Sequence, residues 1–142
     1  MLGLDEAGPT TLRPMTAQLD GDRDEGPIWF FSSTDSAIVQ GLGKQDHALF
    51  SFESKSHSVF ANVHGHLFRS TDRLTIDRLW NPWVAAWYEG GKDDPKLALL
   101  RFDPARAEIW RDGSSLLAGL SVLFGANPKT EFKDNVAKVA LN

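Results

Sequence analysis

Three side chains in the first quarter of the chain are of types that bind a phosphate group. Arg13 lies early in a predicted strand, Ser32 ends the next strand, and Ser36 precedes a short predicted helix. Arginine offers paired N–H donors, serine offers hydroxyls, and the first turn of a helix leaves backbone N–H groups free. One interpretation is a phosphate site; the other is a surface arginine beside an ordinary helix N-cap. The residue types alone support both equally.

Four histidines are candidate metal ligands. His64 and His66 are two residues apart on a predicted strand, so their imidazoles share one face, and His47 and His57 precede them. Two histidines can ligate one metal ion, but the chain has no cysteine, and no acidic residue at matching spacing completes the set. Exposed or hydrogen-bonded histidines are therefore the favoured interpretation, and no metal site is predicted.

Tryptophans recur at helical spacing between residues 76 and 88. Trp80, Trp83 and Trp87 form an apolar stripe, which favours packing in the core or in a dimer interface over a platform for a ligand. Pro82 lies inside this stretch and predicts a kink or two short helices. No serine lies in a G-x-S-x-G elbow, which argues against a serine hydrolase.

The elements that would position these residues are mostly strands joined by turns. Alternating or apolar patterns predict strands at residues 11–19, 28–32, 47–53, 58–69, 97–102 and 107–110, with short helices beginning near residue 37 and spanning 114–124. The tail from residue 129 to 142 fits either a helix or a strand. Along 58–69, Val59, Ala61, Val63 and Leu67 are predicted to face one way and His64 and His66 the other. An antiparallel barrel or sandwich with helices outside is the expected architecture.

Length and composition fit one soluble domain over residues 1–142. The chain has nineteen acidic and fifteen basic residues, a net charge of −4 that argues against a general nucleic-acid binder. The absence of cysteine excludes disulfides and thiolate metal sites. No apolar run reaches the roughly 18 residues of a membrane span, and the acidic start is unlike a signal peptide, so a cytoplasmic location is expected.

Six short segments, in this order, resemble a known family. They are RPM (13–15), WFFSS (29–33), DS (35–36), LWN (79–81), AWYEGG (86–91) and AEIW (107–110). Together they are similar to the general stress protein branch of the pyridoxamine 5'-phosphate oxidase-like, FMN-binding split barrels. The resemblance covers nearly the whole chain, and its most specific part is the tryptophan segment that runs into Gly90 and Gly91.

The resemblance implies a fold, a cofactor and a partner. It implies a six-stranded antiparallel split β-barrel with flanking helices, which forms a homodimer with FMN in a cleft between the subunits. The implied cofactor-binding residues are Arg13, Pro14, Met15, Thr16, Phe31, Ser32, Ser36 and Trp110. In the family, the residue matching Arg13 contacts the phosphate, the backbone at Met15 and Thr16 lies against the ring, and the aromatic matching Trp110 comes from the other subunit.

One departure from the family concerns the phosphate. Many flavin-binding relatives place a basic residue just after the serine, whereas Ala37 and Ile38 follow Ser36 here. Loss of one charge-assisted contact, about 1.5–3 kcal/mol, weakens affinity by roughly one to two decades. Three functions stay open: an FMN-dependent oxidoreductase, a flavin-binding protein without turnover, and a structural homodimer that has lost tight FMN binding. No catalytic residue, substrate or electron donor is indicated.

Overall fold

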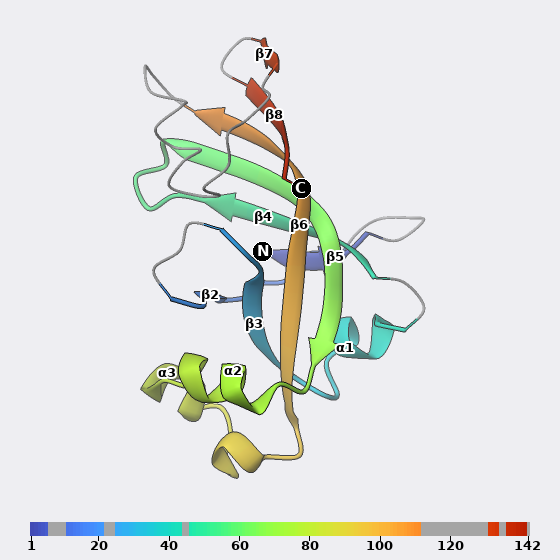
Figure 1. The fold of residues 1–142 in the computed structure, drawn as a ribbon, viewed down its shortest axis with the longest axis vertical. Helices are drawn as coiled ribbons and strands as arrows, with labels where there is room; N and C mark the ends of the chain where they lie inside the picture. The colour runs from blue at the N-terminus through green and yellow to red at the C-terminus, as the bar shows by residue number, and fades with distance from the viewer. Residues whose placement is uncertain (6–10, 22–24, 44–45, 112–130, 134–135, 142) are drawn as a thin grey trace.

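The computed structural model describes residues 1–5, 11–21, 25–43, 46–111, 131–133 and 136–141. Its strands are β1 (Leu2–Leu4), β2 (Ala17–Leu19), β3 (Ile28–Ser33), β4 (His47–Glu53), β5 (Val59–Ser70), β6 (Leu97–Arg111), β7 (Glu131–Lys133) and β8 (Val136–Ala140). Its helices are α1 (Ala37–Gly41), α2 (Arg73–Leu79) and α3 (Pro82–Ala85), with a 3-10 turn η1 (Gly91–Asp93). The strands join one antiparallel sheet, and the helices lie at its margins (Figure 1). The predicted mainly β class is confirmed.

Two long strands, β5 and β6, run through the centre of the sheet (Figure 1). β6 pairs with β5 along one edge, and along its other edge it pairs first with β3 and then with β8. Between these two parts of β6, the register of the β5–β6 ladder shifts at a β-bulge, where Ala105 has no residue opposite it on β5. On the other edge of β6, the Leu141 N–H donates a hydrogen bond to the Ala105 carbonyl at 2.8 Å.

The bulge at Ala105 lies where the sequence predicts a break between two strands, and that prediction is wrong. Residues 97–102 and 107–110 were expected to be two strands because Pro104 has no N–H to give to a ladder. They are one strand, because the proline falls where β6 changes partner and its missing donor costs no ladder bond. Gly65 on β5 allows the close approach: a Cβ there would lie 2.2 Å from the Asp103 carbonyl oxygen.

The main core lies on the inner face of the curved sheet. On β5, Ala61, Val63 and Leu67 are buried and Val59 is partly buried, which confirms the predicted inward face. Rings from three different strands meet there: Phe30 and Phe50 pack edge to face at 5.4 Å between centroids, and Phe50 lies 6.2 Å from Phe102. Each fully buried Leu or Phe side chain stabilises the fold by roughly 1.5–3 kcal/mol.

A second, smaller core attaches the helices to the sheet. Ile76 and Leu79 of α2 pack on Trp29 and Leu99, with Phe31, Trp80 and Leu97 at the margin. Asp72 caps α2 through the Leu74 N–H, and Asn81 caps α3 through the N–H groups of Trp83 and Val84. Pro82 therefore splits this stretch into two helices, as predicted, because proline is tolerated at the first position of a helix.

The tryptophan stripe differs from its prediction. Trp80 lies in the second core, but Trp83 and Trp87 are each 85% exposed, so their expected packing within the chain is wrong. Their helical spacing predicts one continuous apolar face with Trp80. A new helix, α3, begins at Pro82 instead, and both rings lie outside the core.

Other differences lie at the ends of the chain. β1 was not predicted, because three residues are too few for a periodic pattern, and the tail forms the strands β7 and β8. With these additions the described residues hold eight strands in place of the expected six. The helix predicted at residues 114–124 lies outside the described residues. Among the described residues, no helix has the length and apolar character needed to cross a membrane.

Candidate functional site

A cavity of about 520 Å³ opens between the end of β3, the chain before β2 and the segment around α3. This volume is within the 300–1,000 Å³ range of small-molecule sites. It is lined by Arg13, Pro14, Met15, Thr16, Gln18, Phe31, Ser32, Ser33, Asp35, Ser36, Trp83, Val84, Trp87, Tyr88, Asp94 and Lys96. Seven of the eight residues named from the sequence are in this set. The eighth, Trp110, is not.

The segment with Arg13 is held by backbone pairing at both ends. Arg13 forms a two-way bridge with Leu2, with N···O distances of 2.9 and 3.0 Å, and Ala17 begins the β2 pairing with Phe30. Residues 14–16 cross the interval between these two fixed points and line the cavity. The Arg13 side chain is exposed, and among the described residues no carboxylate forms an ion pair with it. Its guanidinium is therefore available to an anionic ligand.

Two serine hydroxyls meet at the wall of the cavity. Ser32 Oγ and Ser36 Oγ are 2.9 Å apart, and Ser36 Oγ also accepts the Val39 N–H at the start of α1. Of two hydroxyls that share one hydrogen bond, one keeps its proton for another acceptor. Ser36 is thus the predicted N-cap, and the pair still offers one donor to a ligand.

Tyr88 fixes the wall behind these hydroxyls. Its hydroxyl donates to the Ser32 carbonyl at 2.7 Å, in a bond buried from solvent. Burial raises the pKa of Tyr88, and the charge of Asp94 raises it further. The phenol therefore stays protonated and holds the turn after α3 against β3.

Lys96 is a cation at this site that the sequence reading missed. Its backbone is fixed twice: its carbonyl accepts the Thr34 N–H at 2.8 Å, and its N–H donates to Asp94 Oδ1 at 2.8 Å. The side chain is exposed at the edge of the cavity. It takes this place because Leu97 pairs with Ser33, which puts residue 96 beside the end of β3. Only the β3–β6 register could have revealed this neighbour.

Two carboxylates accompany Lys96. Backbone N–H groups of Gly90 and Lys96 lower the pKa of Asp94, and the Lys96 charge lowers it further. A hydrogen bond from Ser33 lowers the pKa of Asp35, with a smaller contribution from the Lys96 charge. Both are ionised at neutral pH, so the lining of the cavity carries two cations and two anions.

Part of the cavity wall is aromatic. Phe31 packs edge to face on Trp80, with centroids 6.0 Å apart, so its ring is held from behind. Trp83 and Trp87 line the same cavity from α3 and the turn after it. Their exposure makes them available to another protein surface, as in the dimer interface that the helical pattern allowed, or to a flat ligand, which that pattern did not favour.

Trp110 lies elsewhere on the sheet. It is on β6 opposite Phe60 of β5, in the half of the strand that pairs with β8. Of this pair, Phe60 is 43% exposed. In the part of the chain that the structure describes, Trp110 does not line the cavity.

Comparison with known proteins gives the context of this site. The family model described as pyridoxamine 5'-phosphate oxidase like matches residues 1–132. A general stress family protein from Xanthomonas campestris pv. campestris is 58% identical with a TM-score of 0.72, covering 84% of this chain and 81% of that one. The general stress FMN/FAD binding protein from Xanthomonas citri is 56% identical with a TM-score of 0.71, covering 84% and 83%.

Two more distant relatives extend the comparison. General stress protein 26 from Jannaschia sp. CCS1 is 31% identical with a TM-score of 0.71, covering 99% of this chain and 88% of that one. Protein bli-3 of Neurospora crassa is 27% identical over 82 residues, which is 52% of this chain and 39% of the fungal protein. The fold is therefore shared with general stress proteins along nearly the whole chain, whereas the fungal match is partial.

Proposed function

Because this chain belongs to the pyridoxamine 5'-phosphate oxidase-like family, we propose that it is an FMN-binding general stress protein whose cofactor occupies the cavity around Arg13. The observation that carries the proposal is the convergence of Arg13, Lys96 and the Ser32–Ser36 hydroxyl pair on one cavity that aromatic side chains also line. FMN combines the matching chemical groups, a phosphate and a flat ring system. The Xanthomonas citri relative, described as FMN/FAD binding, supports the choice of a flavin.

The phosphate end needs cations and hydroxyl donors. A phosphate monoester carries close to two negative charges at pH 7, and the cavity offers Arg13 and Lys96 to balance them. Ile38 stands where many relatives have a basic residue, so Lys96 supplies the second positive charge from a different strand. The residues present thus fit FMN, although the nearby carboxylates reduce the net attraction.

The ring end is formed by the backbone of residues 14–16 and by Phe31. A second copy of the chain would cover the ring from the other side with Trp110, which does not line the cavity of its own chain. Phe60, which is opposite Trp110 in the β5–β6 ladder and 43% exposed, is suited to such a contact. We therefore propose a homodimer of single-domain chains with the cofactor site at the interface, located in the cytoplasm.

Bound FMN would supply reversible hydride and single-electron transfer, and the protein would orient the ring and exclude water. The activity proposed is that of a flavin-dependent oxidoreductase. A flavin-binding protein without turnover is the second candidate, favoured by one observation: the protonated Tyr88 hydroxyl is already committed to the Ser32 carbonyl. Mixing the FMN-loaded protein with NADH or NADPH in a stopped-flow instrument distinguishes the oxidoreductase from the non-catalytic flavin-binding protein. Loss of the visible absorbance of the flavin indicates a nicotinamide-linked reductase.

Replacing Arg13 tests the site itself. Arg13→Ala removes one charge-assisted contact to the phosphate, so FMN affinity falls by roughly ten- to a hundredfold in a fluorescence titration. Arg101→Ala is the matched control, because this exposed arginine pairs with Asp103 and does not line the cavity. Equal affinity of Arg13→Ala and wild type would reject the assignment.

A further inference from the structure

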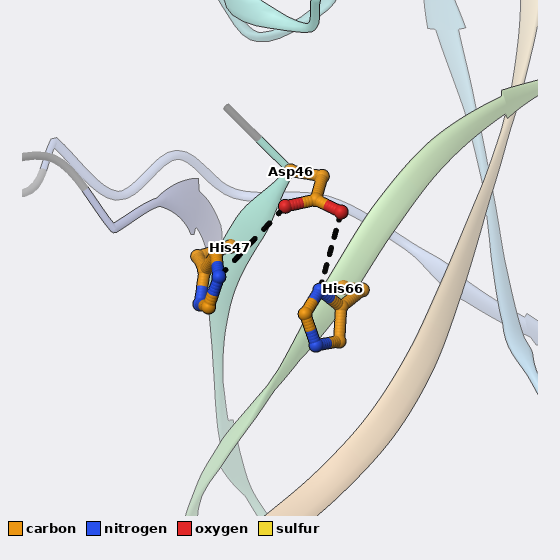
Figure 2. A group of neighbouring side chains, drawn as sticks. All are labelled: Asp46, His47 and His66. Carbon is orange, nitrogen blue, oxygen red and sulfur yellow. Dashed lines mark hydrogen bonds and ion pairs between the residues drawn. The ribbon is translucent and has the colours of Figure 1, made fainter. Parts of the chain in front are cut away.

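Asp46, His47 and His66 form a compact group that does not line the FMN cavity (Figure 2). His66 Nδ1 is 3.2 Å from one carboxylate oxygen of Asp46, and His47 Nε2 is 3.9 Å from the other. The two imidazole centroids are 4.7 Å apart. One potential ligand atom from each of the three residues lies within 4.8 Å of the other two.

The sheet holds the backbone of all three residues in place. His47 of β4 and His66 of β5 are directly opposite each other in the ladder, so their side chains leave the same face of the sheet. The Asp46 carbonyl continues this ladder by accepting the Leu67 N–H at 2.7 Å. The Phe68 ring lies nearly parallel to the His66 ring, with centroids 6.3 Å apart and 15° between the planes.

We propose that Asp46, His47 and His66 bind one divalent first-row transition metal ion per chain, of the Zn²⁺, Co²⁺ or Ni²⁺ type. Two imidazoles and one carboxylate suit these ions, whereas Mg²⁺ and Ca²⁺ require oxygen ligands throughout. With ligand bonds of about 2.0–2.2 Å, a tetrahedral ion holds its ligand atoms about 3.3–3.6 Å apart. The separations here need only side-chain rotation to reach that range, because the backbone is already fixed.

The ion has access to the group and room for further ligands. The side chains of His47, Asp46 and His66 are 69%, 44% and 41% exposed. Three protein ligands leave at least one coordination position for water or a small anion. Asp46 also lines a cavity of about 700 Å³, together with Phe68 and Arg69.

The sequence could not indicate this group. No carboxylate lies at matching spacing along the strand of His64 and His66, and the pairing of β4 with β5 brings one from elsewhere in the chain. The acidic ligand comes from the residue before β4, twenty positions earlier in the chain. The cross-strand register, which brings His47 opposite His66, is a tertiary feature.

Calorimetric titration of the untagged full chain with ZnCl₂ tests the proposal. We expect one Zn²⁺ per chain, and at least a tenfold weaker affinity for His47→Ala and for His66→Ala. Asp46→Asn, which keeps the side-chain shape, is expected to weaken binding as well. His57→Asn is the matched control: this exposed histidine pairs with Glu53 and has a φ of 55°, which asparagine tolerates, so its Zn²⁺ affinity should equal that of wild type.

A thermal melt of each variant distinguishes loss of a ligand from loss of the fold. Zn²⁺ should raise the melting temperature of wild type and of His57→Asn, and not that of His47→Ala, while all three melt alike without metal. Co²⁺ in place of Zn²⁺ should give visible absorption bands that disappear in His66→Ala. Absence of saturable binding, one ion per two chains, or an equal loss of affinity in His57→Asn would overturn the proposal. None of these measurements depends on flavin binding.

Discussion

Replacing Lys96 by methionine removes the second cation of the cavity while keeping the length of the side chain. The backbone of Lys96 is fixed by hydrogen bonds to Thr34 and Asp94 that do not involve the amine. The substitution therefore leaves the path of the chain unchanged. Its effect should fall on the ligand phosphate alone.

The size of the effect follows from the surroundings. A hydrogen bond to a charged group contributes about 1.5–3 kcal/mol, which is a factor of roughly 10 to 150 in affinity. Lys96 is exposed and lies near the ionised Asp35 and Asp94, which compete for its charge. Water and these carboxylates screen the Lys96 charge, so we expect a loss of FMN affinity at the lower end of this range, about tenfold.

Comparison of two ligands makes the assay specific. FMN and riboflavin share the ring, and only FMN carries the phosphate. We expect Lys96→Met to weaken FMN binding about tenfold and to leave riboflavin binding unchanged, both followed by quenching of flavin fluorescence. Lys92→Met is the control, since Lys92 pairs with Asp77 and lies outside the cavity. Equal losses for both flavins would refute the phosphate role of Lys96.

Three further predictions concern stability. Tyr88→Phe removes a buried hydrogen bond to a β3 carbonyl and should lower the free energy of unfolding by about 1–2 kcal/mol in urea denaturation. Gly65→Ala places a Cβ 2.2 Å from the Asp103 carbonyl oxygen and should cost about 1–3 kcal/mol by the same method. Arg78 lowers the pKa of Asp20 below its ordinary value of 3.8, so this pair stabilises the fold above pH 3.8 and the gain is lost as pH falls through the depressed pKa. Asp20→Asn should therefore be less stable than wild type at pH 7, and urea denaturation should show the difference narrowing below pH 3.8.

Each of these predictions has a result that would contradict it. Unchanged stability of Tyr88→Phe would mean that the phenol does not hold the turn after α3 to β3. Gly41→Ala is the control for Gly65→Ala, because its Cβ would meet only the movable Leu4 methyl at 2.6 Å, and it should cost less. A difference between Asp20→Asn and wild type that stays constant from pH 7 to pH 3 would exclude the ion pair as its source.

Local patterns in the sequence were sufficient for much of the fold. The strand at 47–53 agrees with the structure to the residue, and the helix expected near residue 37 begins there with Ser36 as its N-cap, because alternation and capping are local effects. The break at Pro82 was also predictable, since proline acts on its own backbone. By contrast, the continuity of β6 through Pro104 depends on which strands pair with it, and local sequence patterns do not reveal strand pairing.

The candidate site shows the same division. Arg13, Ser32 and Ser36 were identified by residue type and by resemblance, and the structure brings them to one cavity. Lys96 was missed because its position depends on the pairing of Leu97 with Ser33. The exposure of Trp83 and Trp87 was missed because helical spacing shows which residues share a face and not what covers that face.

Titration of the purified wild-type chain with FMN tests the central claim most directly. Binding in the cavity predicts saturable quenching of FMN fluorescence at one FMN per chain, and a yellow protein after desalting at protein concentrations above the dissociation constant. A colourless protein that leaves FMN fluorescence unquenched across the whole titration would contradict it.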